Sequence, residues 1–264
     1  TKEDYGVWGI ILAYTGALDA LFLLGMGVVL SNAFFKMPTQ HKWLWRQIYG
    51  FLSIWSIPYC IGVGFLLWFV LPPEASDQAL LLILLLLVPK AIFGPVNILG
   101  TFYYQLRQNP TPIAIRTAIF GLITVLLNIY TISYLKMGFM GWAWSSFIVA
   151  ILMNVSYWVP LNFLLGLKPI FNFKWRLIKN SFQVSLPTIP HTYSAFLLNS
   201  SDRIVMDQLH VSTGDLGGYN LASSFGGYFQ SLIGAANQAV SPMMLESYKK
   251  KRDAEARDLI FALQ

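Results

Sequence analysis

The sequence predicts an all-α protein, a polytopic helical bundle that spans a membrane. Hydrophobic residues make up 56% of the 264 residues, charged residues only 11%, and the mean hydropathy is +0.56. So few charges would leave the surface of a soluble domain of this size poorly solvated. The apolar runs reach about 18 residues or more, the length of a spanning helix, whereas barrel strands alternate in polarity and need only about 10 residues.

Apolar length, together with the placing of Pro, Gly and charged residues, predicts seven spanning helices. They cover residues 7–34, 47–71, 80–104, 113–135, 140–165, 181–208 and 219–245. The chain starts at Thr1 without a methionine and stops inside a further apolar run, 259–263. We therefore expect it to be a piece of a longer protein.

The charges in the loops predict the orientation of these spans. If residues 1–6 lie outside, nearly all basic residues fall at the cytoplasmic face, as the positive-inside rule requires. These residues are Lys36, Lys42, Arg46, Arg107, Arg116, Lys168, Lys174, Arg176, Lys179, Lys249, Lys250, Lys251, Arg252 and Arg257. Lys2, Lys136 and Arg203 fall outside or near the outer edge, where the acidic loop 72–78 also lies. This asymmetry explains the net charge of +6, so we expect the lipid bilayer and not nucleic acid as a partner.

The first and third spans each contain a charge near the middle of the membrane. Asp19 lies in the first span, and Lys90 follows Pro89 in the third, with Asn97 further along the same helical face. A charge at the centre of the hydrocarbon costs at least about 2.5 to 3.5 kcal/mol, so both side chains must face protein, water or a partner. We expect Asp19 and Lys90 to pair, either as a structural salt bridge or as a substrate or ion site.

The segment 167–180, LKPIFNFKWRLIKN, is too short and too charged to span the membrane. It mixes aromatic residues such as Phe171 and Trp175 with basic residues such as Lys174. This pattern is typical of an amphipathic segment that lies on the membrane surface with its bases near anionic headgroups. We expect it to link two groups of helices at the cytoplasmic face.

The sixth span begins with Pro187 and Pro190 and ends in an adjacent opposite-charge pair, Asp202 and Arg203. Prolines are tolerated in a spanning helix because neighbouring helices, hydroxyls or water serve the freed carbonyls. Asn199 lies one turn from Arg203 on a polar face. We expect Asp202 to orient Arg203, either as a brace at the rim of a pathway or as a contact with a substrate.

A stripe of small and polar residues runs along one face of the seventh span. It consists of Asn220, Ser224, Gly227, Ser231, Gly234, Gln238 and Ser241. Small residues suit close packing between membrane helices. Asn220 and Gln238 are larger than packing alone needs, so the stripe is either a packing seam or the wall of a wet cavity.

The sequence contains no pattern of catalytic or metal-binding residues. It has no cluster of His and Cys for a metal, no paired carboxylates near a membrane edge and no Gly-rich phosphate loop. The one cysteine, Cys60, has apolar neighbours and is expected to be a packing residue. We therefore expect a protein that is not an enzyme and that uses no cofactor or metal.

A series of short motifs along the chain resembles the landmarks of one family. The motifs are Glu3-Asp4-Tyr5-Gly6, Leu24-Gly25-Met26-Gly27, Gly138 with Gly141-Trp142, Leu186-Pro187, Asn199 with Asp202-Arg203, Gly218-Tyr219 and Ser241-Pro242. Their order and spacing resemble those of the polysaccharide and lipid-linked oligosaccharide flippases of the multidrug, oligosaccharidyl-lipid and polysaccharide exporter superfamily. The resemblance implies that the seven spans are family helices two to eight.

The resemblance also implies two helical lobes around a central cavity that opens alternately to the two sides of the membrane. Residues 1–166 would form the N-terminal lobe without its first helix, 167–180 the linker, and 181–264 the start of the C-terminal lobe. The implied substrate is a polyprenyl-pyrophosphate-linked oligosaccharide, which moves from the cytoplasmic to the outer leaflet of the plasma membrane during synthesis of cell-surface polysaccharides such as O-antigen or exopolysaccharide. Glycan polymerases and glycosyltransferases would be its protein partners.

In this interpretation basic cavity residues meet the pyrophosphate and polar residues meet the sugars. The candidate substrate-binding residues are Arg203, Lys90, Asn199, Asn97, Gln238 and Asn220, and the candidates for ion coupling or a salt bridge are Asp19 and Asp202. One alternative is a cation-coupled exporter of small organic compounds from the same superfamily, with Asp19 as its ion or proton site. Another is a membrane subunit of glycan-polymerising machinery.

Overall fold

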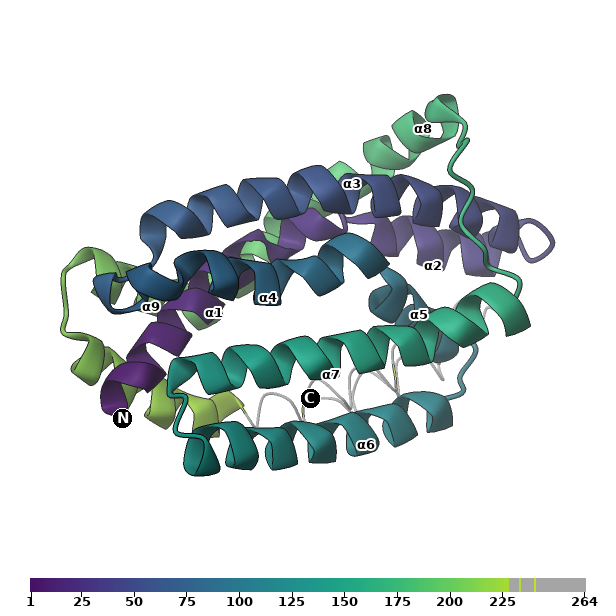
Figure 1. Cartoon of the computed structure of the whole chain (residues 1–264). Coiled ribbons are helices and arrows are strands. Elements are labelled where there is room, and N and C mark those ends of the chain that lie inside the picture. The colour runs from purple at the N-terminus through teal and green to yellow at the C-terminus, as the bar shows by residue number, and fades with distance from the viewer. Residues whose placement is uncertain (228–232, 234–239, 241–264) are drawn as a thin grey trace.

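The protein is a bundle of helices, with no strand in the part that the structure describes (Figure 1). The computed structural model describes residues 1–227, 233 and 240. Four helices in this part are long and apolar enough to cross a membrane, namely His41–Val70, Pro73–Phe93, Thr111–Tyr134 and Phe139–Leu164. Three of them match the second, fourth and fifth predicted spans closely, and Pro73–Phe93 overlaps the first part of the third. The total of seven spans remains a prediction, and most of the seventh lies outside the described residues.

The first predicted span consists of two helices and not one. α1 (Lys2–Phe22) and α2 (Met26–Lys36) are separated by a break in which Leu24 and Gly25 have φ angles of +50° and +68°. A left-handed residue cannot continue a right-handed helix, so the prediction of one helix over 7–34 was wrong. An apolar run reports the length of a segment but not a change of backbone conformation inside it.

The third predicted span is interrupted in the same way. α4 (Ala79–Phe93) ends at Gly94, whose φ of +56° and ψ of −137° suit glycine, and α5 (Val96–Leu106) begins after Pro95. The N–H of Gly94 donates to the carbonyl of Lys90 at 2.9 Å and closes the last turn of α4. The prediction of a single helix was therefore wrong here too, because Gly-Pro stops a helix even within an apolar run.

The remaining helices of the first part follow the predicted spans closely. α3 (His41–Val70) leads through a 3₁₀ turn (Pro73–Gln78) into α4. α6 (Thr111–Asn128) and α7 (Phe139–Val159) each end in a π-helical turn, Ile129–Tyr134 and Pro160–Leu164. α4 packs against both α3 and α7, and α6 runs alongside α7 (Figure 1).

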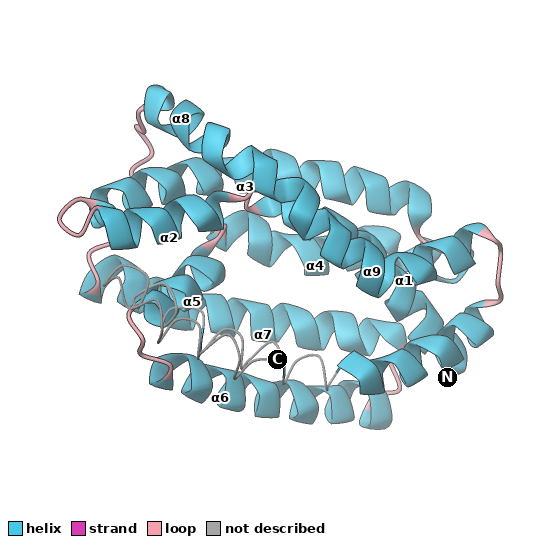
Figure 2. Cartoon of the chain, turned by 180° about the vertical axis from the view of Figure 1, so that it is seen from behind, coloured by secondary structure: helices cyan, strands magenta, loops and turns pink. Residues whose placement is uncertain are grey.

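The second part of the chain returns along the first two helices. Residues 165–174, which we call the strap, cross the start of α3 without regular structure and lead into α8 (Trp175–Ser185). A 3₁₀ turn, Leu186–Thr188, separates α8 from α9 (Ile189–Gln208), and a further helix covers 213–227. α8 packs on α2 and α9 packs on α1, as Figure 2 shows from behind.

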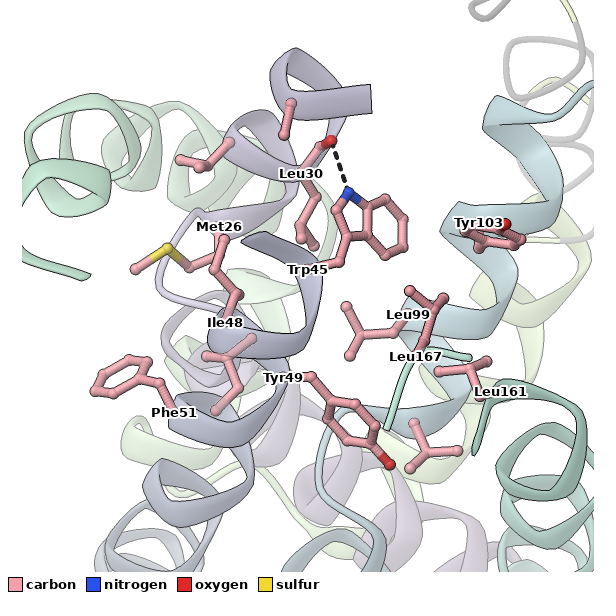
Figure 3. Packing of buried hydrophobic residues seen from close by; sticks show 14 of the residues in the cluster. Met26, Leu30, Trp45, Ile48, Tyr49, Phe51, Leu99, Tyr103, Leu161 and Leu167 are labelled. Atoms are coloured by element: carbon pink, nitrogen blue, oxygen red, sulfur yellow. Dashed lines mark hydrogen bonds between the residues drawn. The ribbon is translucent and has the colours of Figure 1, made fainter. Parts of the chain in front are cut away.

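The largest buried cluster surrounds Trp45 in α3 (Figure 3). Its indole N–H donates to the carbonyl of Leu30 in α2 at 3.1 Å, and its ring meets the edge of Tyr103 with centroids 5.6 Å apart. A Cβ on Gly100 would lie 2.3 Å from the ring of Tyr157, so α5 approaches α7 closely at this glycine. Lipid tails are as apolar as this core, and helices in a membrane are therefore held together by such close packing and by hydrogen bonds.

Candidate functional site: an ion pair at two helix breaks

The described part of the structure brings Asp19 of α1 and Lys90 of α4 together. The ammonium of Lys90 forms a salt bridge with Oδ1 of Asp19, and the hydroxyl of Tyr59 in α3 donates to the same oxygen at 3.3 Å. The Lys90 nitrogen also lies 5.3 Å from the ring centroid of Phe22 and 5.9 Å from that of Tyr59, within cation–π distance. The contact expected between Asp19 and Lys90 is thus present.

Both charges lie where a helix stops at a break in the chain. Asp19 is in the last turn of α1 and Lys90 in the last turn of α4, so each is next to carbonyls that have no partner within their own helix. A cation is favoured at a helix C-terminus and an anion is not, which makes Asp19 the member that needs its partner most. The helix breaks therefore create a polar environment around the ion pair.

Side chains in the middle of α3 donate hydrogen bonds to carbonyls at the ends of both α1 and α4. The indole N–H of Trp55 donates to the carbonyl of Leu21 at 3.1 Å, and the hydroxyl of Ser56 contacts the carbonyl of Ala91 at 3.3 Å. With Tyr59 one turn further on, a single stretch of α3 contacts α1, α4 and the ion pair. The site is thus held by three helices from different parts of the sequence.

The ion pair is not sealed inside the described structure. The Lys90 side chain is 35% exposed and that of Asp19 56% exposed. Exposure of charges to hydrocarbon is costly, so a pair at this depth requires water or polar groups on its open side. The pair is thus open on one side and differs from a salt bridge closed within a core.

Asp202 and Arg203 each contact the helix 213–227. Asp202 accepts hydrogen bonds from the backbone N–H of Arg203 and from the hydroxyl of Tyr219, while the guanidinium of Arg203 donates to Ser223 at 2.7 Å. Their side chains form no ion pair with each other in the described part, and the role of Asp202 as a partner that orients Arg203 remains a prediction. Adjacent helical residues point in different directions, and both side chains instead tie α9 to the helix 213–227. Nε of Arg203 is buried without a hydrogen-bond partner.

The amide candidates divide into described and undescribed residues. The side-chain amide of Asn220 donates to the carbonyl of Tyr5 at 3.1 Å and is buried against Gly9, which is the geometry of a packing seam. Asn97 is half-buried in α5 and contacts the sulfur of Met153 at 3.8 Å. The side chain of Asn199 and all of Gln238 lie outside the described part of the structure.

Three residues, Tyr14, Arg116 and Tyr59, make polar contacts within the bundle that were not anticipated from the sequence. Tyr14 of α1 donates to Asp207 at 3.0 Å and accepts from Gln208 at 3.0 Å, which ties α1 to the end of α9. Arg116 of α6 stacks on the ring of Tyr157, with its guanidinium carbon 4.5 Å from the centroid. Tyr59 completes the set. A hydroxyl or guanidinium within an apolar helix is the only sequence signal for these residues, and it does not name the partner.

The motifs at the two helix starts 1–6 and 138–142 meet in space. Asp4 accepts a hydrogen bond from the N–H of Phe139 at 3.0 Å and thereby caps α7. The rings of Tyr5 and Trp142 pack edge to face with their centroids 4.7 Å apart. Burial tends to raise the pKa of Asp4, but the hydrogen bonds from Thr1 and Phe139 outweigh it and lower that pKa below its usual value. These motifs therefore build the architecture at this end of the bundle.

No cluster of three His, Cys, Asp or Glu side chains that could hold a metal ion is found among the described residues.

Comparison with curated proteins and with solved structures finds no significant match. The family model described as "Polysaccharide biosynthesis protein" matches residues 1–247, which is nearly the whole chain. With its apolar spanning helices and this match, the chain belongs to the polysaccharide biosynthesis protein family.

Proposed function

We propose that this protein is a flippase, which moves a polyprenyl-pyrophosphate-linked oligosaccharide from the cytoplasmic to the outer leaflet of the plasma membrane. Membership of the polysaccharide biosynthesis family supports a role in making a cell-surface glycan, and the spanning helices support a role within the membrane. Flipping needs no covalent chemistry, and catalytic groups are not part of the proposal. Glycosyltransferases would supply the substrate and a polymerase would use it.

The observation that carries the proposal is the open side of the Asp19–Lys90 pair. A pair with side chains 56% and 35% exposed at mid-membrane depth is compatible with a water-filled pathway and not with contact to lipid tails. Such a pathway lets a charged headgroup and its sugars cross while the lipid tail stays in the bilayer. In the superfamily arrangement, two lobes would expose this pathway to each side in turn.

Lys90 is the described cation best placed to meet the pyrophosphate. Its ammonium has three donors, and the contact with one oxygen of Asp19 leaves the others for a second anion. A pyrophosphate that approaches from the open side would compete with Asp19 for the ammonium. Arg203 would act further toward the outer face, where its hydrogen bond to Ser223 holds the guanidinium in place.

The test is a flipping assay on the purified protein in proteoliposomes, with a fluorescent polyprenyl-pyrophosphate oligosaccharide and a quencher that cannot cross the membrane. Lys90→Ala and Arg203→Ala are compared with Lys136→Ala, an exposed lysine between α6 and α7. We expect the first two variants to lose flipping at least tenfold while the control keeps it. Normal flipping by both variants, with unchanged unfolding temperatures, would show that the cations do not act on the substrate.

The exposed Asp19 carboxylate favours one other candidate, the cation-coupled export of small organic compounds. An acid that is 56% exposed at mid-depth is able to take up a proton or a sodium ion as Lys90 moves away. The two candidates differ in their cargo, and proteoliposomes with an imposed pH or sodium gradient distinguish them. Gradient-driven uptake of a hydrophobic organic cation, without movement of the lipid-linked glycan, would favour the exporter.

A further inference from the structure

One end of the bundle presents a surface of basic and aromatic side chains that come from two distant segments. We call it the basic face. Its residues are Lys36, Lys42, Trp43 and Arg46 around the start of α3, and Lys168, Phe171, Lys174, Trp175, Arg176 and Lys179 in the strap and α8. The end of α2 and the strap meet α3 at the right of Figure 1, where the two segments come together.

The strap is fastened to α3, so the basic face is a built surface and not a flexible tether. Four hydrogen bonds join the two segments: Lys42 Nζ to Leu165 O at 3.0 Å, Arg46 Nε to Lys168 O at 2.8 Å, Ile170 N to Arg46 O at 2.9 Å, and Lys174 N to Gln47 Oε1 at 2.8 Å. A Cβ on Gly50 would lie 2.0 Å from the carbonyl of Ile170, so the backbones touch at this glycine.

The aromatic residues of the basic face are partly or largely exposed. Phe171 and Trp175 are 60% and 61% exposed and Trp43 is 39% exposed, and the ammonium of Lys174 lies 5.5 Å from the ring of Trp43. Ile178, one turn along α8 from Trp175, is fully buried, and the ring centroid of Trp175 lies 6.3 Å from that of the buried Phe51. α8 therefore packs the side of Ile178 on the bundle, keeps the ring of Trp175 at the exposed end of that side, and exposes the bases Arg176 and Lys179, which is the arrangement of helices that lie in a membrane interface.

Nothing in the neighbouring sequence neutralises these bases. The chain has no Asp or Glu between residues 20 and 73 or between 78 and 201. The acidic residues of the described part apart from Asp19 lie in the segments 3–4, 74–77 and 202–215, and Thr213 contacts Glu74 while Gly217 abuts Lys2, so these segments gather at the other end. Among the described residues, no acidic side chain forms a salt bridge with the basic face, so its bases are able to attract anions from outside the chain.

The length of α3 places the basic face at the level of the lipid headgroups. A helix of 30 residues is about 45 Å long at about 1.5 Å per residue, whereas the hydrocarbon core is about 30 Å thick. The last turns of α3 are wholly apolar, from Phe65 to Val70, so the excess lies at its start, where Lys42 and Arg46 are. Aromatic rings and basic side chains are both favoured at this level.

We propose that the basic face binds the headgroups of anionic phospholipids in the adjacent leaflet, and that these lipids hold the strap and α8 against the membrane. Fixed bases attract the phosphates, and exposed rings enter the boundary between headgroups and tails. Both elements are needed to recognise a lipid, since a soluble phosphate needs only the bases. The proposal is independent of the cargo and stands whether or not the protein is a flippase.

The experiment measures binding of fluorescent phosphatidylglycerol to the purified protein in a neutral detergent. Lys174→Gln with Lys179→Gln removes two bases of the basic face, and Lys2→Gln with Lys136→Gln removes two exposed lysines elsewhere with the same change of net charge. One base near an anionic surface contributes a factor of about five in affinity. We expect the first double variant to bind phosphatidylglycerol at least about tenfold more weakly and the second to bind like the unmodified protein.

A further variant separates a lipid from a free anion. Trp175→Ala is expected to weaken phosphatidylglycerol binding several-fold, and unlabelled phosphatidylcholine or pyrophosphate at the same concentration is expected to leave the bound signal unchanged. Equal losses in both lysine double variants, displacement by phosphatidylcholine, or displacement by pyrophosphate would each overturn the proposal. Unfolding temperatures of all variants, measured without lipid, show that each is folded before binding is compared.

Discussion

Replacing Asp19 by Asn and Lys90 by Met, singly and together, separates a transport role of the ion pair from a structural one. Two unit charges about 4 Å apart attract by about 4 kcal/mol at an effective dielectric constant of 20. The side chains are 56% and 35% exposed, which screens this attraction, and exposed pairs contribute about 0.2–1 kcal/mol when measured. The depth in the membrane raises the value again, so we expect a coupling energy near the upper limit, about 1 kcal/mol.

The stability of the four proteins gives this coupling energy directly. Each single variant leaves one charge at mid-depth without its partner and is expected to unfold more easily, and the double variant is expected to recover part of the loss. Chemical unfolding in detergent, followed by tryptophan fluorescence, measures all four. A coupling energy indistinguishable from zero would mean that the contact does not stabilise the fold.

Transport then decides the role of the pair. If Lys90 meets the pyrophosphate, the double variant flips the lipid-linked oligosaccharide at least tenfold more slowly than the unmodified protein even though its stability has recovered. Lys136→Met, at an exposed lysine outside the site, should retain full activity. A double variant that is both stable and fully active would refute the assignment of Lys90 as a substrate contact.

Three further predictions concern the architecture. Gly25→Ala should lower the free energy of unfolding by more than about 2 kcal/mol, because a left-handed φ of +68° costs about 1–2 kcal/mol for alanine and its Cβ would lie 2.3 Å from the carbonyl of Ser185. The control Gly166→Ala, at a φ of +69° with no atom near the new Cβ, should show only the backbone cost. Trp45→Phe should cost about 1–3 kcal/mol in denaturant unfolding, because the buried indole loses its hydrogen bond to the Leu30 carbonyl and the smaller ring leaves a cavity. Asp4→Asn should lower the unfolding temperature at neutral pH. Because the pKa of Asp4 is lowered in the fold, the ionised carboxylate stabilises the unmodified protein above about pH 4, and this advantage over the variant should disappear as the pH falls below that value. Unfolding temperatures of the unmodified protein and the variant that change equally with pH would contradict this.

Much of the site was accessible from the sequence by an energetic argument. Asp19 and Lys90 are costly at mid-depth, and charges of opposite sign at the same depth reduce that cost by pairing, so their contact was predicted without coordinates. The same reasoning did not anticipate the partners of Asp202 and Arg203. Neighbours in a helix point in different directions, and their hydrogen bonds went to Tyr219 and Ser223 instead.

The interruptions of the helices were harder to predict. Gly94-Pro95 contains a local signal, because proline and glycine both oppose helix continuation, and that signal was outweighed by the length of the apolar run. At Leu24 the sequence contains no breaker at all, although the residue has a φ of +50°. The neighbouring Gly25 is explained by the tertiary structure, because a Cβ there would lie 2.3 Å from the carbonyl of Ser185.

Composition and spacing by themselves indicated that this chain is helical and lies in a membrane, and they led us to expect a contact between the two opposite charges Asp19 and Lys90. Those conclusions rest on solvation energies, which depend on residue type and depth alone. The tertiary structure decided which carbonyls the α3 residues Trp55 and Ser56 serve, that Tyr59 joins the ion pair, and that bases 120 residues apart form one surface. These contacts join residues far apart in the chain, and their partners follow from how the helices pack and not from the pattern of any single helix.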